Sequence, residues 1–218
     1  MKLKEKRMMS YFIDSTREII DKYGFDEISI RKIAEHSGYN SATLYNYFKN
    51  LDVLLIYSSI SYFKDYIIDL RSKIKNITNP IDRYIEIYKV FNEYAFKYPD
   101  IYFNMFYGKY SKLLPEIIDD YYNIFPEELK KNDVDDMEDI TKMFRKGDIY
   151  KRDYEITKEF IKFGISSEDT YFIIDTTIRV HSSYLYQVIY NKNLNLDEHK
   201  KNFIDFLNYL IKRIGKYE

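Results

Sequence analysis

The chain has 218 residues, no cysteine and a formal net charge of −1. Its length suffices for one small and one medium domain, and the lack of cysteine excludes disulfides and thiolate metal sites. We find neither a signal peptide nor a run of about 18 apolar residues, so we expect a cytoplasmic protein with no membrane partner.

Composition favours a helical fold with a slightly basic N-terminal part. Six glycines and four prolines are few, which favours long helices over sheets. Residues 1–51 carry nine Lys and Arg against seven Asp and Glu, and the remainder carries 25 against 28. This asymmetry has the sign expected of a DNA-binding domain on a neutral body. We attribute the 25 tyrosines mainly to genome base composition, and an aromatic-lined pocket is the alternative.

Two helices are predicted before a glycine turn. The first runs from about residue 4 to 23. The second begins after Ser29, a suitable N-cap, and carries Ile33 and Ala34 on its apolar face. Gly38 ends it, because glycine enters left-handed backbone space without steric cost.

A further short helix is predicted over residues 41–48. Asn40 suits its N-cap, and Leu44 and Phe48 anchor it at an i, i+4 spacing. Its other side chains are small or polar, as in the major-groove helix of a helix-turn-helix. The candidates for DNA contact are Ser29, Arg31, Lys32, Asn40, Ser41, Ala42, Thr43, Tyr45, Asn46, Tyr47 and Lys49.

The second helix of this motif predicts the kind of operator. Ser41, Thr43 and Asn46 can reach base edges, and this helix has no Arg or Lys to bind guanine. We therefore expect A·T pairs to dominate the contacted positions, with phosphate contacts from basic residues outside the helix. A short solvated helix without DNA contacts is the alternative.

This motif resembles the DNA-binding domain of the TetR/AcrR family of bacterial transcriptional regulators. The Tyr-x-Tyr-Phe ending is the most particular feature, and the matching segments are 23–25, 29–34, 37–39, 43–48 and 54–55. One departure concerns the Lys-Glu pair that usually follows in the family, whose Lys often contacts phosphate. Leu51 and Asp52 stand there, and Lys49 is the candidate replacement.

The remainder predicts an all-α body. We expect one long helix from Leu51 to about residue 75, and shorter helices over about 80–98, 100–107, 134–146 and 153–163. The predicted architecture is a three-helix DNA-binding domain at 1–50 followed by a helical ligand-binding and dimerisation domain at 51–218.

The last two predicted helices favour a homodimer. They span residues 168–191 and 197–215, and the first, with Ser167 as its expected N-cap, is apolar or aromatic over most of its surface. A helix that is apolar nearly all round is buried on two sides, and in a chain this small a second subunit is expected to cover one of them. The family resemblance implies the same pairing.

Aromatic residues on the body helices predict a site for an apolar or aromatic small molecule. The candidates are Tyr62, Tyr66, Tyr84, Tyr88, Phe91, Phe103, Phe106, Tyr121, Phe172 and His181. Core packing is the alternative for most of the rings, and a hydrogen-bonded interior position is the alternative for His181.

The sequence offers no catalytic residues and no cofactor motif. No Ser-His-Asp set, phosphate loop or dinucleotide fingerprint is visible. The acidic residues within 133–139 lack EF-hand spacing, so we interpret them as a solvated helix start and expect no metal.

The leading hypothesis is a dimeric repressor that a small-molecule effector releases from a near-palindromic, double-stranded DNA operator. The alternative is a constitutive DNA-binding protein without an effector.

Overall fold

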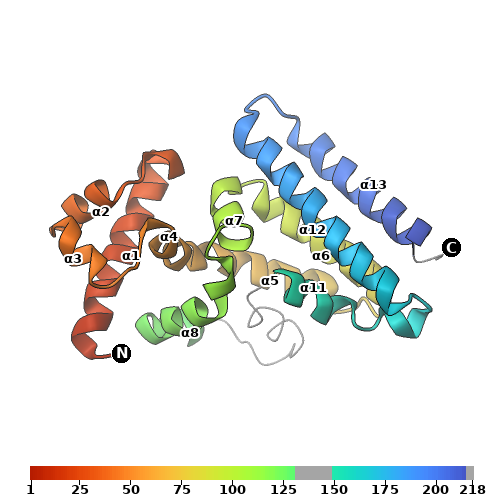
Figure 1. The fold of residues 1–218 in the computed structure, drawn as a ribbon, viewed down its shortest axis with the longest axis horizontal. Coiled ribbons are helices and arrows are strands. Elements are labelled where there is room, and N and C mark those ends of the chain that lie inside the picture. The colour runs from red at the N-terminus through yellow and green to blue at the C-terminus, as the bar shows by residue number, and fades with distance from the viewer. Residues whose placement is uncertain (131–148, 215–218) are drawn as a thin grey trace.

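The computed structural model describes residues 1–130 and 149–214, and every regular element in these ranges is a helix, which confirms the all-α prediction (Figure 1). The principal helices are α1 (Leu3–Tyr23), α2 (Ile30–His36), α3 (Ser41–Tyr45), α4 (Leu51–Ser59), α5 (Phe63–Ile74), α6 (Pro80–Ala95), α7 (Pro99–Phe106), α8 (Leu114–Ile124), α9 (Pro126–Lys130), α11 (Ile149–Thr157), α12 (Ser167–Tyr190) and α13 (Leu196–Ile214). The first three lie at one end of the molecule, and α12 and α13 lie at the other. None of the helices in the described ranges has the length and apolar character needed to cross a membrane.

The predicted helix-turn-helix is formed by α2 and α3. Gly38 has φ +77°, and the Gly38 and Tyr39 amides donate to Glu35 (3.2 Å) and Ala34 (2.8 Å). This pair of hydrogen bonds is the Schellman ending, which requires left-handed backbone at its glycine. The following α3 is shorter than predicted and ends at Tyr45, while the Phe48 side chain is still buried.

The predicted long helix from Leu51 to residue 75 is wrong, because the chain is interrupted by a 3-10 turn at 60–62. The hydroxyls of Ser58 and Ser59 donate to the carbonyls of Leu54 (3.0 Å) and Leu55 (2.6 Å) one turn earlier. Such hydrogen bonds from serine compete with the helical ladder and bend helices. The result is two helices, α4 and α5.

The body places α6 between α5 and α13, with α7 and α11 packed against α12. The end of the chain follows the prediction closely, although the α12 N-cap is Ser166, whose hydroxyl accepts from the Asp169 amide (3.0 Å), and not Ser167. The helix predicted over 153–163 is instead α11 followed by a 3-10 turn at 160–163. The helix predicted over 134–146 and the acidic cluster lie outside the described residues.

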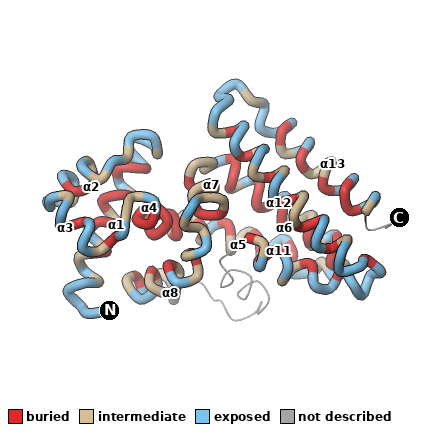
Figure 2. The backbone as a smooth tube through the Cα atoms, viewed as in Figure 1, coloured by how far each residue is buried: buried red, intermediate tan, exposed pale blue. Residues whose placement is uncertain are grey.

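Helix α4 is the most completely covered element of the molecule. Every residue from Val53 to Ile60 is buried, and Figure 2 shows α4 in red between the N-terminal helices and the body. It packs against α1 on one side and against α7 and α8 on the other. The core therefore continues from the N-terminal helices into the body.

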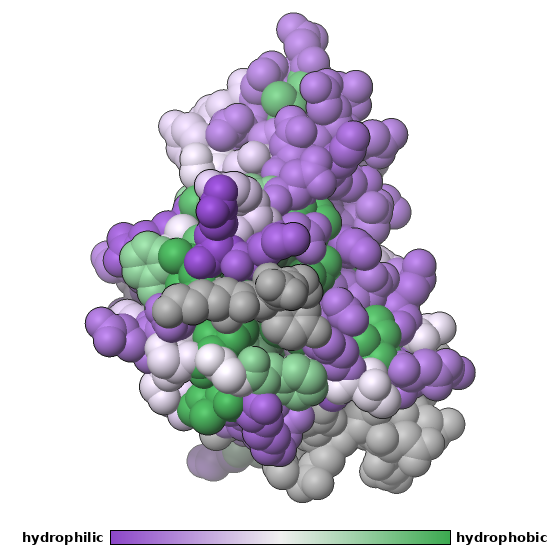
Figure 3. Space-filling model, turned by 90° about the vertical axis from the view of Figure 1, so that its right-hand side faces the viewer, coloured by the Kyte–Doolittle hydropathy of each residue, from purple (hydrophilic) through white to green (hydrophobic). Residues whose placement is uncertain are grey.

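Large apolar side chains are exposed along α12. The exposed fractions are 66% for Tyr171, 52% for Phe172, 53% for Tyr186 and 70% for Tyr190. Apolar atoms also reach the surface between polar residues on the side of the molecule drawn in Figure 3. Within one chain, α12 is therefore not buried on both of the sides that the sequence predicts to be covered.

Phe12 of α1 is the main core ring of the N-terminal helices. Its ring is fully buried and lies 6.3 Å from that of Phe48, edge to face. We expect Phe12→Ala to lower the free energy of unfolding by about 3–5 kcal/mol, because a cavity replaces the ring. Tyr11→Ala, at a neighbouring side chain that is 55% exposed, should change it by less than about 0.5 kcal/mol. Urea denaturation followed by circular dichroism measures both, and equal losses would contradict the assigned packing.

Candidate functional site

The predicted DNA-contacting residues form the exposed surface of α2, α3 and the segment that follows. Asn40, Ala42, Asn46 and Lys49 are exposed, and Tyr45 is 54% exposed. The side chains of Ser41, Thr43 and Tyr47 are partly buried, and the Tyr47 ring lies 6.2 Å from Phe12. A short polar helix thus projects from the end of the molecule (Figure 1).

Asn40 fixes the hydrogen-bonding character of Thr43. Its side-chain oxygen accepts from the Thr43 amide (2.8 Å) and from the Thr43 hydroxyl (3.0 Å). Because the hydroxyl proton is used there, the free lone pairs of Thr43 can only accept. An acceptor in the major groove matches the amino group of adenine or cytosine.

The basic candidates are held by neighbouring acids. Arg31 pairs with Glu35 (2.8 Å), and Lys32 pairs with Glu27 (3.1 Å). Such exposed pairs contribute little stability, so a phosphate can replace the acid at small cost. Lys49 lies 5.5 Å from the ring of Tyr110, and Ser29 serves as the N-cap of α2.

Six of the predicted effector-site residues share one buried aromatic core. They are Tyr66, Tyr84, Tyr88, Phe91, Phe106 and His181, contributed by α5, α6, α7 and α12. The rings of Tyr66 and Phe91 are 5.7 Å apart, and those of Phe91 and Phe106 are 5.3 Å apart. Phe103 is partly buried at the edge of this core, beside Tyr107.

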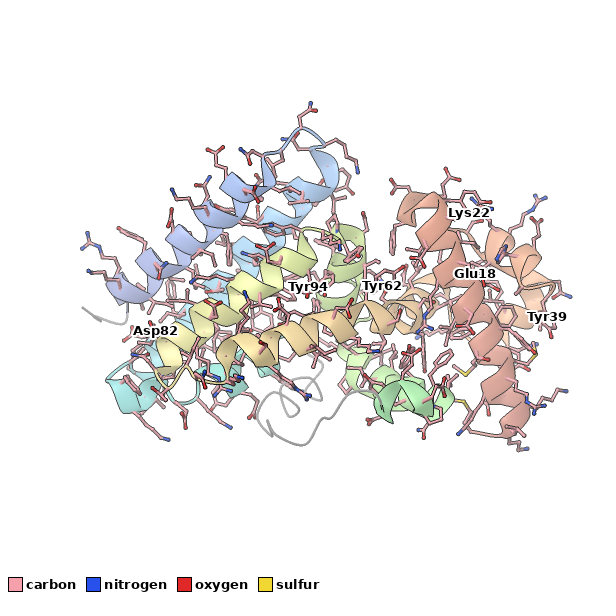
Figure 4. The ribbon with its side chains drawn as sticks, turned by 180° about the vertical axis from the view of Figure 1, so that it is seen from behind. Glu18, Lys22, Tyr39, Tyr62, Asp82 and Tyr94 are labelled. Atoms are coloured by element: carbon pink, nitrogen blue, oxygen red, sulfur yellow. The ribbon has the colours of Figure 1, made fainter. Side chains whose placement is uncertain are left out.

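Three other candidates lie elsewhere. Tyr62 faces the space between α1 and α5, where its hydroxyl donates to Asp21 (2.5 Å; Figure 4). Tyr121 is buried at the contact of α1 with α8, where it meets Arg17 and Glu128. Phe172 is half exposed, because α12 turns the neighbouring Ile173 and Ile174 inward instead. These three do not line the aromatic core.

His181 is a fully buried, hydrogen-bonded histidine. Its Nε2 donates to the Asn92 side-chain oxygen (2.9 Å), and its Nδ1 accepts from the Tyr107 hydroxyl (2.6 Å). Burial, with a smaller contribution from His199, lowers the pKa of His181 to about 3. The imidazole is therefore neutral at physiological pH.

Asp153 is a second buried titratable group in this core. The hydroxyls of Tyr84 (2.8 Å) and Tyr88 (2.7 Å) both donate to its Oδ2. Burial raises the pKa of Asp153 to about 6, although the tyrosines and Arg152 favour its ionised form. The guanidinium of Arg152 is buried too, 4.4 Å from the ring centroid of Phe106.

A small cavity adjoins these charged groups. Its volume is about 20 Å³, and Ile87, Tyr88, Arg152, Asp153 and Ile156 are among the lining residues. That volume has room for about one water molecule. A surface depression of about 230 Å³ shares Ile87 and Ile156 with the cavity. The aromatic core is thus nearly filled, and its cavity adjoins the surface depression at these two isoleucines.

Arg152 and Asp153 were missed as site residues, although their spacing carries a signal. Ile149, Arg152, Asp153 and Ile156 follow an i, i+3, i+4, i+7 pattern, which defines the buried face of a helix. Charged residues at two of these positions are unusual, since burial of a charge is costly. That pattern indicates two charged side chains on a buried helix face.

Comparison with known proteins identifies the N-terminal domain. Residues 12–57 match the family profile of bacterial regulatory proteins, tetR family. This segment covers most of α1, all of α2 and α3, and the first part of α4. No curated protein matches the sequence.

Solved structures with the same fold cover nearly the whole chain. FadR of Thermus thermophilus, a TetR-family repressor solved with lauroyl-CoA, is 16% identical with a TM-score of 0.57, covering 92% of this chain and 93% of its own. RolR, solved with resorcinol, is 12% identical with a TM-score of 0.56, covering 99% and 96%. A TetR transcriptional regulator from Rhodococcus sp. RHA1 is 10% identical with a TM-score of 0.53, covering 95% and 97%.

His181 makes acid sensitivity a test of the core. The unfolded imidazole takes up a proton below about pH 6.5, whereas the folded one stays neutral down to about pH 3. This group's contribution to stability therefore falls by about 2 kcal/mol from pH 7.5 to pH 5. The variant His181→Gln does not undergo that loss. Between pH 7.5 and pH 5, its free energy of unfolding should therefore rise by about 2 kcal/mol relative to that of the wild type. Urea denaturation at both pH values measures the difference, and an unchanged difference would contradict a buried neutral imidazole.

Proposed function

This chain belongs to the TetR family of bacterial regulatory proteins, and we propose that it is a dimeric repressor that leaves its operator when a small molecule binds the helical body. A helix-turn-helix joined to that body through α4, which is buried from Val53 onward, is the observation that carries the proposal. Its DNA target places its action in the cytoplasm. The division into domains at residue 50 stays a prediction.

The proposed DNA contacts divide between base edges and phosphates. The exposed Asn46 supplies a base contact that suits A·T pairs, and Thr43, whose hydroxyl donates to Asn40, supplies an acceptor for adenine or cytosine. Arg31, Lys32 and Lys49 lie at the edges of this surface as phosphate contacts. A dimer would place two such helices in successive major grooves of a near-palindromic site.

The exposed rings of α12 support the proposed dimer. The rings of Tyr186 and Tyr190 are in contact, with 4.3 Å between their centroids and a tilt of 38°, and both face solvent in the single chain. Contiguous exposed apolar residues mark interaction surfaces. A second copy of α12 and α13, within residues 168–191 and 197–215, would cover them.

The aromatic core supports effector binding. Charged groups are rarely buried in a core that has only a structural role, because burial of a charge is costly. Arg152, Asp153 and His181 are all buried here. Burial lowers the pKa of Arg152 and of His181 and raises the pKa of Asp153, and groups with shifted pKa values cluster at functional sites. Proteins of the same fold were solved with lauroyl-CoA, which carries an apolar acyl chain on a charged coenzyme A, and with resorcinol, which is an aromatic diol.

The small size of the cavity favours a second candidate, a constitutive DNA-binding protein. A cavity of about 20 Å³ lies well below the roughly 300 Å³ at which ligand pockets begin. The two functions differ in one measurement. DNA selected from a random pool is bound in a mobility-shift assay, with and without a panel that includes lauroyl-CoA and resorcinol. Release by any member supports the repressor, and full retention with the whole panel supports constitutive binding.

Sedimentation tests the dimer. At micromolar concentration we expect the wild type to sediment as a dimer, with an interface on the order of 2,000 Å². Tyr186→Asp should shift it toward monomer, because a carboxylate would be buried without a partner. Tyr154→Asp, at a 59% exposed ring on α11, is the matched control and should leave the dimer intact. A monomeric wild type would refute the two-groove arrangement.

A duplex series tests the recognition helix. The double variant Thr43→Ala with Asn46→Ala should lose about 1–3 kcal/mol per base contact and discriminate less between selected and scrambled duplexes. Lys49→Ala should weaken binding to all sequences alike and lower the salt slope by about one unit per site. Affinities at several salt concentrations separate the two effects. If the double variant keeps full discrimination, base reading lies on other residues.

A further inference from the structure

We propose, on the basis of the effector-binding function above, that the effector is an uncharged aromatic molecule with a hydroxyl group, that this hydroxyl donates to Asp153, and that the molecule enters between Ile87 and Ile156. The small cavity of about 20 Å³ would then be the unliganded form of the site. Hydrogen bonding, charge, ring packing and access each support one part of this assignment.

Asp153 has an acceptor to offer. Both tyrosine donors use Oδ2, so Oδ1 receives no hydrogen bond from the part of the chain that the structure describes. Asp153 lines the cavity and is only 5% exposed. A carboxylate oxygen without a protein donor gains a hydrogen bond from a donor that enters the cavity. A hydroxyl supplies such a donor.

The charges around the cavity favour an uncharged molecule. Arg152 and Asp153 both line it, so the described residues give the site one cation and one anion. An anionic ligand would be repelled by Asp153, and a cationic ligand by Arg152. A neutral hydroxyl can donate to the carboxylate without adding a net charge to a buried site.

The walls favour an aromatic body. Tyr66, Tyr88 and Phe91 line the cavity, and their rings already meet one another edge to face. An inserted ring would extend this packing at the usual centroid distances of about 4.5–7 Å. Aliphatic chains would lose that contribution.

Two isoleucines control access to the cavity. Ile87 of α6 and Ile156 of α11 line both the cavity and the surface depression, so the two spaces adjoin at these side chains. Turning their side chains would join the two spaces, and the combined volume approaches the lower end of ligand pockets, roughly 300 Å³. Ile156 is only partly buried, so its side chain is the freer of the two to turn.

Phenol and anisole are the probes for the hydrogen bond. The two molecules share the ring and the oxygen, but only phenol can donate. Calorimetric titration of the full-length wild type should give at least about tenfold tighter binding of phenol, the effect of one hydrogen bond to a charged group. Benzoate should bind more weakly than phenol. Equal affinity for phenol and anisole would overturn the assignment.

Asp153→Asn locates the acceptor. Its oxygen can keep both tyrosine donors, while its amide NH₂ replaces Oδ1 and can donate to either probe. The preference for phenol should therefore fall to about onefold, with circular dichroism used to verify folding. Asp119→Asn makes the same change at an exposed position of α8 and should keep the wild-type preference. A preference that survives Asp153→Asn would also overturn the proposal.

Ile156→Ala tests the route of entry. Truncation of this side chain should speed phenol association at least about threefold, whereas Ile161→Ala, at a 56% exposed isoleucine outside both spaces, should not. An unchanged rate would exclude this route.

DNA binding measured on the same preparations distinguishes a failure of the effector assignment from a failure of the proposed regulator function. If the wild type does not bind DNA, the proposed regulator function is wrong. If DNA is bound and phenol shows no preference, only the effector assignment fails.

Discussion

The burial of α4 is the constraint on which the rest of the structure depends. The Tyr57 ring packs edge to face on Phe48 at 5.4 Å, while its hydroxyl donates to Asp120 of α8 (3.0 Å). Arg17 of α1 donates to the Ser58 carbonyl (3.4 Å) and also meets Glu128 (3.5 Å) beyond α8. Because interiors are close-packed, a displacement of α7 or α8 cannot leave α4 and α1 unchanged. The DNA-binding helices are therefore mechanically coupled to the body.

Two buried titratable groups in the body have opposite effects on stability as pH changes. Asp153 has a raised pKa, so its contribution is present at low pH and declines as pH rises through about 4 to 6. His181 has a lowered pKa, so its contribution is present above about pH 6.5 and declines as pH falls. Their slopes partly cancel between pH 4 and 6. The core thus tolerates two costly groups with less net dependence on pH than either would give alone.

The sequence predicted features with local causes and missed those with tertiary causes. Gly38 and Asn40 specify the turn and the start of α3 by backbone geometry and capping, both visible in a few residues. The break after Ser59 depends on where two serine hydroxyls turn, which spacing does not show. Aromatic content could not separate Tyr66, in the core, from Phe172, on the surface, because α12 is apolar on several faces. Arg152 and Asp153 are recognisable only once their face is known to be buried.

Helix α6 connects the proposed effector site to the rest of the molecule. It carries Tyr84, Tyr88 and Asn92 toward the buried polar groups and packs against both α5 and α13. A ligand that displaces Ile87 therefore acts on α6. This helix contacts both α5, which leads back to the DNA-binding helices, and α13, which belongs to the proposed dimer surface. Between α5 and the DNA-binding helices the chain forms the 3-10 turn at 60–62, where the Tyr62 hydroxyl donates a hydrogen bond to Asp21 of α1. Short 3-10 segments within helices often mark hinges. We therefore expect a shift of α5 to rotate the DNA-binding helices about this turn and not to bend α4.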